Sequence, residues 1–354
     1  MSAPTPVFDG HNDLLLRLHR APERREAIWL GKEGGGHLDL PRMRSGGLMG
    51  GFFAIYVPSP KRTGGADPEA LMDAPPYRLD TPEPIGPAQA EPAAMDMARH
   101  LLWMERASGG ALRLCRDVSD LEGSLASGAV AAILHMEGAE AIGPDLDALH
   151  LWHALGLRSL GPVWSRPNQF GHGVPFAFPA GPDDGPGLTP AGRDLVRLCD
   201  ELGILIDLSH LNEVGFWDVA RLSLAPLVAT HSNAHAVCPS SRNLTDRQLD
   251  AIRDTGGVVG LNFATAFLRP DGRRDPDTGL DAVLRHLDHL LERLGEAGVA
   301  LGSDFDGATV PAAIGDVAGL PALIAALADH GFDDALIHGI AHRNWLALLR
   351  RTWA

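Results

Sequence analysis

Short runs of apolar residues recur along the whole chain and alternate with segments of helical periodicity. Eight of these runs are rich in β-forming residues, and polar residues follow most of them directly. Strands that alternate with helices form parallel sheets, because each helix carries the chain back to the starting edge. The runs expected to form strands are PVFDGHND (6–13), LMGGFFAIYV (48–57), AVAAILHMEG (129–138), LRSLGPVW (157–164), GILIDLSH (203–210), PLVATHS (226–232), GVVGLNF (257–263) and VALGSDFDG (299–307).

Helical segments separate these predicted strands, and their ends carry recognisable signals. Thr189 and Thr245 precede helical patterns, so we expect them to act as N-caps. Glycine often ends a helix because it adopts the left-handed conformation without steric cost. The expected helices cover 190–203, 245–257 and 282–298, and their expected stops are Gly203, Gly256 and Gly298.

Eight successive βα units predict a (β/α)8 TIM barrel, formed by residues 1–354 as a single domain. An open, doubly wound sheet is the alternative for such a pattern. Polar residues follow at least six of the predicted strands, and barrel enzymes assemble their sites from the C-terminal ends of many strands. An open sheet would concentrate them at one crevice, so the barrel is favoured.

Two long Pro- and Gly-rich segments interrupt the βα pattern. Segment 58–93 follows the second predicted strand, and segment 165–188 follows the fourth. Both therefore emerge on the face where a barrel carries its active site. The first is expected to form a lid, an oligomer contact or a mobile excursion.

Charge and cysteine content narrow the classes of partner and compartment. The net charge of −15 argues against nucleic acid or an anionic membrane as partner. The three cysteines are scattered without a CxxC pair, which fits buried thiols in a reducing compartment. The N-terminus shows no signal-peptide pattern, and no apolar stretch approaches the ~20 residues of a membrane span. A cytoplasmic protein is expected.

Side chains able to bind metal ions or transfer protons follow the predicted strands. His11 and Asp13 end the first strand and lie on one side of it, because strand side chains alternate between faces. A single such residue is usually structural, whereas several on one barrel rim indicate a metal site. The full set is His11, Asp13, Glu137, His210, His231 and Asp304.

This mixture of imidazoles and carboxylates exceeds the needs of one metal ion. A catalytic divalent metal takes about three protein ligands and keeps a position open for water. Two metals need roughly twice as many ligands, or one carboxylate that bridges both, and Glu137 is the natural bridge. A hydroxide between the metals is a nucleophile at neutral pH. A spare carboxylate, for which Asp304 is the candidate, would position it and pass its proton on.

Five motifs resemble those of the membrane (renal) dipeptidase family, peptidase family M19 of the amidohydrolase superfamily: DGHND, EG at 137–138, DLSH, THS followed by VCPSSRN, and GSDFDG. The resemblance implies a barrel that holds two zinc ions per chain. It places His11 and Asp13 on one zinc and His210 and His231 on the other, with Glu137 bridging them. Family members tend to pair, so a homodimer is expected.

The resemblance also assigns roles around the substrate. Asp304 matches the residue that handles the proton of the bridging water, and Arg242, in SSRN, matches the arginine that receives the dipeptide's C-terminal carboxylate. Trp164 stands where mammalian members carry a histidine that polarises the scissile carbonyl, and Phe267 where they carry a tyrosine. His172, in the following loop, is a candidate replacement for that histidine.

The sequence thus predicts zinc-dependent hydrolysis of dipeptides with a free C-terminal carboxylate, by a metal-bridging hydroxide. One alternative is an amidohydrolase that acts on N-acyl amino acids or lactones. Many such enzymes begin with an HxH pair and use a strand-four lysine, whereas this chain has HND and no lysine near residue 164. The other alternative is a metal-retaining barrel with a binding or regulatory role, supported only by the departures at Trp164 and Phe267.

Overall fold

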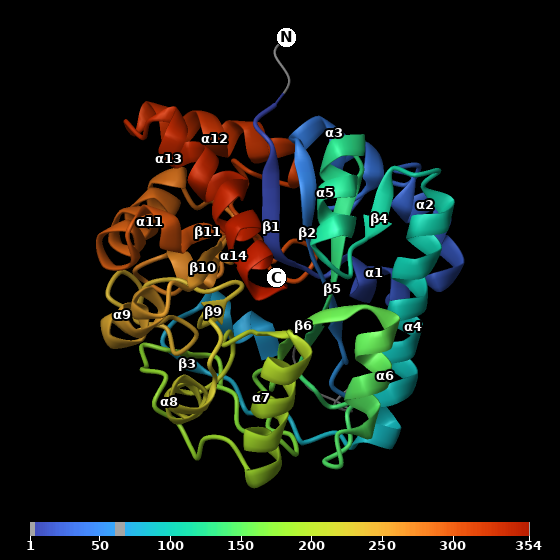
Figure 1. Ribbon diagram of the computed structural model, residues 1–354. Coiled ribbons are helices and arrows are strands. Elements are labelled where there is room, and N and C mark those ends of the chain that lie inside the picture. The colour runs from blue at the N-terminus through green and yellow to red at the C-terminus, as the bar shows by residue number, and fades with distance from the viewer. Residues whose placement is uncertain (1–3, 61–67, 354) are drawn as a thin grey trace.

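Eight parallel strands form a barrel in the computed structural model, which describes residues 4–60 and 68–353 (Figure 1). The strands are β1 (Val7–Asn12), β2 (Leu48–Tyr56), β5 (Val130–Glu137), β6 (Leu157–Gly161), β8 (Leu205–Ile206), β9 (Val228–Ala229), β10 (Val258–Asn262) and β11 (Val299–Gly302). They are hydrogen-bonded in the order β8-β6-β5-β2-β1-β11-β10-β9. A parallel bridge between Asp207 and Val228 joins β8 to β9. The predicted (β/α)8 TIM barrel is confirmed, and the open sheet is excluded.

Each of the eight runs named from the sequence contains one barrel strand, although β8 and β9 are only two residues long. Beyond these two short strands, the Asp207 carboxylate accepts hydrogen bonds that a backbone carbonyl would accept in a longer strand. Its Oδ1 accepts hydrogen bonds from the backbone N–H groups of Ser209 (3.0 Å) and Thr230 (2.7 Å). One strand of the barrel sheet was missed: β4 (Leu112–Leu114) pairs with the first half of β5, and three residues are too few for a periodic signal.

Helices surround the strands (Figure 1). They are α1 (Leu14–Arg20), α2 (Arg25–Trp29), α3 (Leu40–Gly46), α4 (Pro87–Ala107), α5 (Val118–Ser127), α6 (Asp147–Leu155), α7 (Pro190–Leu202), α8 (Glu213–Leu222), α9 (Asp246–Asp254), α10 (Thr265–Leu268), α11 (Leu280–Leu294), α12 (Leu320–Asp329), α13 (Asp334–His338) and α14 (Asn344–Thr352). Short 3-10 turns cover Pro22–Arg24, Pro68–Asp73, Glu296–Gly298 and Val317–Gly319, and a π-helical turn covers Gly339–Arg343.

Helix ends follow the predicted signals with one exception. The Thr189 side chain accepts a hydrogen bond from Gly192 N–H at the start of α7, and Thr245 forms a capping box with Gln248 in α9. The predicted stop of the third helix at Gly298 is wrong. Helix α11 ends at Leu294, and Gly295 follows with a left-handed φ of 73°. Gly295 comes first along the chain, and its positive φ combined with a ψ of 172° is a conformation open essentially to glycine alone, which ends the helix.

The N-terminal end of the barrel is closed by apolar packing under α14. Trp345 inserts there, and its indole N–H donates to the Leu301 carbonyl at 2.9 Å. Gly10 makes room for it, since a Cβ at this position would lie 2.7 Å from the Trp345 ring and 2.3 Å from the Thr230 carbonyl oxygen. The polar strand ends are thereby left at the opposite end of the barrel.

The two Pro- and Gly-rich segments pair with each other through short strands. β3 (Tyr77–Arg78), from segment 58–93, pairs in antiparallel fashion with β7 (Ala177–Phe178), from segment 165–188. The last residues of the first segment belong to α4, and residues 61–67 lie outside the described residues. Met72 lines the cavity at the barrel mouth, which favours the lid interpretation.

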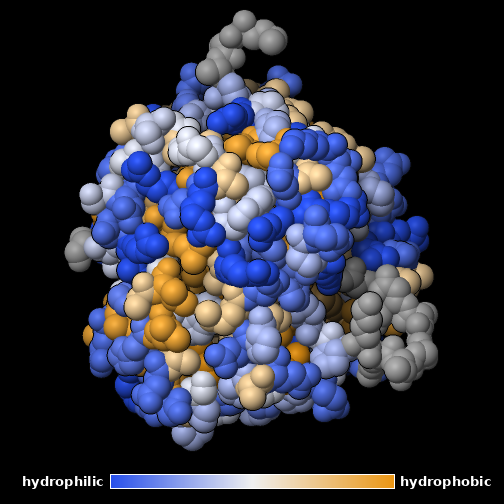
Figure 2. Space-filling model, turned by 90° about the vertical axis from the view of Figure 1, so that its right-hand side faces the viewer, coloured by the Kyte–Doolittle hydropathy of each residue, from blue (hydrophilic) through white to orange (hydrophobic). Residues whose placement is uncertain are grey.

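The surface over α4 and α6 carries a band of hydrophobic side chains between hydrophilic areas (Figure 2). An apolar groove there is lined by Met95, Leu101, Leu102, Leu114, Leu134 and Leu155, together with alanine and arginine stems. The three cysteines are buried and free, as expected. Within the described residues, no helix combines the length and hydrophobicity that crossing a membrane requires.

Candidate metal centre and active site

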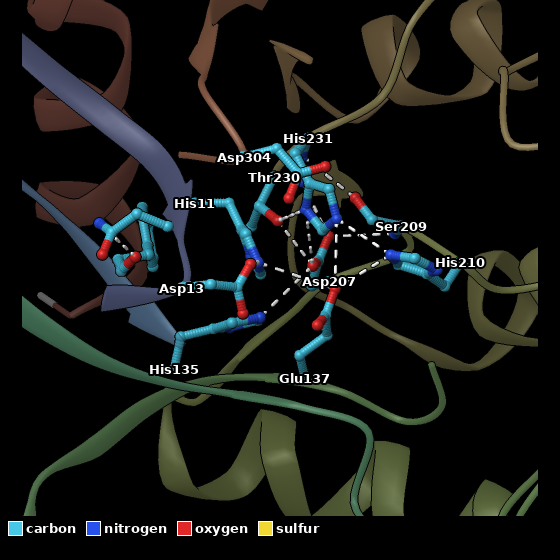
Figure 3. A network of polar contacts seen from close by, with 12 residues as sticks. His11, Asp13, His135, Glu137, Asp207, Ser209, His210, Thr230, His231 and Asp304 are labelled. Atoms are coloured by element: carbon cyan, nitrogen blue, oxygen red, sulfur yellow. Dashed lines mark hydrogen bonds and ion pairs between the residues drawn. The ribbon is translucent and has the colours of Figure 1, made fainter. Parts of the chain in front are cut away.

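Glu137 stands at the centre of a cluster of histidines formed by the barrel strand ends (Figure 3). Its Oε1 lies 3.0 Å from His210 Nε2 and 3.3 Å from His231 Nε2. The same oxygen is 3.7 Å from His11 Nε2. One carboxylate oxygen at the end of β5 thus faces one imidazole within β1 and two that follow β8 and β9.

Asp13 and Asp304 complete the cluster on its β1 side. Asp13 Oδ2 lies 3.5 Å from His11 Nε2. Ligand atoms of His11, Asp13 and Asp304 all lie within 4.8 Å of one another, and the same holds for His11, Glu137 and His231. The two groups overlap at His11. The structure therefore brings all six strand-end residues named from the sequence into one continuous site.

The buried carboxylates and imidazoles of this site form an environment that favours binding of a cation. Burial raises the pKa of Glu137 well above its ordinary value and lowers the pKa values of His210 and His231 well below theirs. Both ring nitrogens of His11, and Oδ1 of Asp13, are buried without a hydrogen-bond partner among the described residues. Unpaired buried polar atoms are costly, and a metal bound by neutral imidazoles and carboxylates would satisfy them. The residues present thus fit a metal site.

Hydroxyl groups hold two of these imidazoles from behind. Thr230 Oγ1 donates to Asp207 Oδ2 at 2.6 Å and lies 2.9 Å from His231 Nδ1. The Thr230 hydroxyl donates its hydrogen to Asp207, so it can only accept a hydrogen bond from the imidazole. His231 is therefore protonated at Nδ1, and the lone pair of its Nε2 faces Glu137. Ser165 Oγ lies 2.7 Å from His210 Nδ1 in the same manner. The sequence reasoning missed these hydroxyls, although Thr230 directly precedes His231.

Asp9 ties the first strand to the last. Its Oδ1 accepts from the backbone N–H of Ser303 at 2.7 Å, and its Oδ2 accepts from the Ser303 hydroxyl at 2.8 Å. Its Oδ1 also accepts from His11 N–H at 3.4 Å. This carboxylate is therefore engaged with backbone and hydroxyl groups, and it holds His11 and the loop carrying Asp304 in a fixed relation.

Arg242 lies buried beside the histidine cluster. Its Nη2 donates to the His231 carbonyl at 3.2 Å, and its Nε has no hydrogen-bond partner among the described residues. The guanidinium carbon lies 5.5 Å from the centre of the Phe267 ring. Asn262 Nδ2 donates to Asp304 Oδ2 at 2.9 Å. The buried guanidinium thus retains unused donor capacity close to the proposed reaction centre.

A cavity of about 180 Å³ opens over this cluster. Its lining combines apolar and polar side chains. The apolar ones include Leu16, Tyr56, Met72, Trp164, Phe176 and Phe267, and the polar ones include Asp13, Arg20, Glu137, His210, Arg274, Asp304 and Asp306. Pockets for drug-sized ligands occupy about 300–1,000 Å³. This cavity therefore suits a smaller molecule.

Comparison with known proteins identifies the family of the chain. The family model described as membrane dipeptidase (peptidase family M19) matches residues 1–353. The chain belongs to this membrane dipeptidase family. The family and enzyme class expected from the sequence are confirmed: the protein is a metal-dependent dipeptidase.

Relatives of this dipeptidase include two solved structures at 64% identity. One is a metallopeptidase from Rhodobacter sphaeroides liganded with a phosphinate mimic of the dipeptide L-Ala-D-Ala, with a TM-score of 0.97 over 99% of this chain and 100% of that one. The other is a structure of dipeptidase AC, with a TM-score of 0.96 over 99% of both chains. An uncharacterized Klebsiella pneumoniae protein from the pqqA 5′ region is 50% identical over 72% of this chain and 96% of its own length.

Trp164 and His172, the candidate replacement for the histidine expected at position 164, occupy different places in this dipeptidase. Trp164 lies in the pocket wall, with its ring 5.0 Å from that of Tyr56 and 5.7 Å from that of His210, centre to centre. His172 is not among the residues that line this pocket. Its carbonyl accepts from Asn212 N–H at 3.3 Å. The structure therefore does not bring His172 to the place of the missing histidine.

A buried ion pair, unnoticed in the sequence, anchors the loop that carries Trp164. Arg166 Nη2 lies 2.9 Å from Glu140 Oε1, and both side chains are fully buried. The same guanidinium donates to Ser59 Oγ at 2.7 Å and to the Val57 carbonyl at 2.9 Å. Arg166 thus connects the loops that follow β2, β5 and β6, and it fixes the wall against which Trp164 packs.

Backbone strain is concentrated at the catalytic strand ends. His210, Asp304 and Asp306 have left-handed φ angles of 67°, 58° and 66°. Non-glycine residues in this region cost roughly 1–3 kcal/mol each and persist where surrounding contacts enforce them. In this dipeptidase the strained residues include a histidine and an aspartate of the site, which turn their side chains into the barrel mouth.

Proposed function

We propose that this dipeptidase binds two zinc ions per chain and cleaves L,D-dipeptides with small side chains, such as L-Ala-D-Ala. The main support for two metal ions is the position of the Glu137 carboxylate, because one of its oxygens faces three histidines. His11 and Asp13 would hold one zinc, and His210 and His231 the other, with Glu137 between them. The phosphinate-liganded relative at 64% identity and the small cavity support the choice of substrate.

Bound zinc ions would activate water at neutral pH and polarise a carbonyl group. Asp304 is placed to take the proton of the attacking water and to deliver it to the leaving amine. Burial raises the pKa of Asp304 above its ordinary value, which suits a group that must hold a proton briefly. Asn262 fixes the orientation of this carboxyl through its hydrogen bond to Oδ2. The proton that Asp304 takes from the water is thus transferred to the amide nitrogen, and the leaving group departs as a neutral amine.

The chemistry is tested with a dipeptide library that covers L,L and L,D members. We expect zinc-loaded protein to hydrolyse L-Ala-D-Ala, and metal analysis to find two zinc ions per chain. Lactones and N-acyl amino acids serve as competing substrate classes in the same assay. Lactone or N-acyl turnover without dipeptide turnover would overturn the proposed substrate, and less than about one zinc per chain would overturn the binuclear site.

Arg242 is proposed to bind the substrate carboxylate, because its buried guanidinium group has an N–H donor, at Nε, without a hydrogen-bond partner among the described residues. We expect wild-type protein to prefer L-Ala-D-Ala over the corresponding dipeptide amide by at least about 30-fold in kcat/KM. Losing a buried charged partner costs about 2 kcal/mol or more, and each ~1.4 kcal/mol is tenfold. Arg242→Met should abolish the preference, and Arg242→Lys should restore part of it. A preference that survives Arg242→Met would place the carboxylate elsewhere.

Ser165 is proposed to orient His210 through its hydroxyl. Removing such a contact behind a metal ligand typically weakens metal binding about 10- to 100-fold. We therefore expect Ser165→Ala to lower zinc affinity by that amount, measured by competition with a chelator of known affinity. Ser127→Ala, at the exposed end of α5, is the control and should leave the affinity unchanged. Equal affinities in both variants would show that Ser165 does not orient the ligand.

Two expectations from the sequence stay predictions. A homodimer is tested by light scattering of the purified protein, and its mass should be twice that of one 37.6 kDa chain. A cytoplasmic location is tested by fractionation of the source cells.

A further inference from the structure

A second cavity, of about 500 Å³, adjoins the catalytic pocket. It lies between α1 with the 3-10 turn that follows it, the glycine-rich loop 34–37, and the loop that follows β11. The two cavities share a strip of lining residues, so they are continuous along one edge. The shared residues are Arg20, Asp306, Gly307, Ala308 and Thr309.

Positive charge dominates the second cavity, whose lining includes three arginines and one carboxylate. Two of the arginines are engaged. Arg17 donates to the carbonyls of Leu38 and Gly34 and faces Asp306 Oδ2 at 3.6 Å, and Arg24 pairs with Glu33. The third, Arg20, is exposed at the C-terminal end of α1.

Arg20 has no hydrogen-bond or ion-pair partner among residues 4–60 and 68–353. It is also the one arginine of this cavity that lines the catalytic pocket as well. Leu16 lines the catalytic pocket too, and it lies one helical turn before Arg20 on the same face of α1. An uncompensated cation therefore stands where the pocket opens into the larger cavity.

The placement of Arg242 determines which part of a dipeptide would face Arg20. Arg242 follows β9, whereas Arg20 follows β1, and these strands are separated around the barrel by β10 and β11. A dipeptide with its carboxylate at Arg242 and its scissile bond over Glu137 would have its N-terminal residue on the β1 side of the pocket, where Asp13 lies. Leu16 and Arg20 line the pocket together with Asp13.

We propose that Arg20 is a specificity-determining residue that binds an anionic side chain on the N-terminal residue of the dipeptide. The proposal rests on the proposed function, because it uses Arg242 as the site of the carboxylate. The adjoining cavity supplies the room that the 180 Å³ pocket lacks, so glutamate is accommodated as well as alanine. Asp306 does not oppose this binding, because its carboxylate accepts from His37 N–H and faces Arg17.

The test compares kcat/KM for L-Glu-D-Ala, its neutral analogue L-Gln-D-Ala, and L-Lys-D-Ala, on the zinc-loaded full chain. We expect wild-type protein to prefer Glu over Gln about fivefold, the upper range for an exposed ion pair. The preference should shrink at high salt. Arg20→Gln should remove it, and Arg20→Glu should reverse it so that L-Lys-D-Ala becomes the better substrate.

Arg44→Gln is the matched control, because Arg44 is an exposed arginine on α3, at the far end of the barrel from the pocket (Figure 1). It should keep the wild-type Glu-to-Gln ratio. A ratio that is unchanged by Arg20→Gln, or a charge reversal that does not favour lysine, overturns the inference. Hydrolysis of L-Ala-D-Ala with equal rates for Glu and Gln overturns the inference alone. Failure to hydrolyse any dipeptide overturns the proposed function as well.

Discussion

Replacing Glu137 with glutamine is expected to lower kcat/KM for L-Ala-D-Ala by at least about 10³-fold. Glutamine keeps the shape of the side chain but removes the charge that faces His11, His210 and His231. Metal ions supply several kcal/mol of transition-state stabilisation, and each ~1.4 kcal/mol is a factor of ten. The kinetic constants and the zinc content of the variant are measured together, and both should fall.

Thermal unfolding separates loss of zinc from loss of fold in this variant. Burial disfavours the charge of Glu137 in the metal-free protein, so the neutral amide should fold at least as stably without zinc. Added zinc should raise the melting temperature of wild-type protein more than that of Glu137→Gln. Glu122→Gln, on the exposed face of α5, is the control and should behave as wild type. Undiminished activity of Glu137→Gln would refute the shared-carboxylate site.

Asp304→Asn is expected to lower kcat by about 10²- to 10⁴-fold, the usual contribution of a general acid–base group. Asparagine can still accept the hydrogen bond from Asn262, so the local geometry should persist. KM should change little, because the proton is transferred only in the chemical step. Steady-state kinetics on L-Ala-D-Ala give both constants, and metal analysis should still find two zinc ions per chain.

The position of Asp304 makes this experiment informative in either direction. Its carboxylate lies within 4.8 Å of ligand atoms of His11 and Asp13, so it is also close enough to bind a metal. Loss of zinc from Asp304→Asn would identify it as a ligand and contradict the proton-transfer role. Asp329→Asn, exposed at the end of α12, is the control and should leave kcat and zinc content unchanged.

The barrel could be predicted from the sequence because its strands are buried on both faces and leave near-continuous apolar runs. The apolar runs were longer than the strands that they contain. In 203–210 only Leu205–Ile206 is strand, because the Asp207 side chain replaces backbone partners. The predicted stop at Gly298 failed for a similar local reason, since Gly295 ends α11 first. Periodicity locates elements, and particular side chains set their ends.

The six strand-end residues could be grouped from the sequence because parallel strands deliver their C-terminal ends to one rim. Contacts made by loops could not be found in this way. Ser165, behind His210, comes from segment 165–188, and Arg20 lies on a helix where a basic residue reads as ordinary surface. Such residues are brought to the site by tertiary packing, and tertiary packing produces no periodic pattern in the sequence.

The hydrogen bonds between Asp9 and Ser303 join positions 294 residues apart. β1 is completed as a barrel strand only when β11 lies beside it, so the ribosome must release nearly the whole chain before His11 and Asp13 meet Asp304. Contacts of such sequence separation form late and slowly. A nascent chain of this enzyme therefore cannot assemble the catalytic centre until the residues around Asp304 have been synthesised.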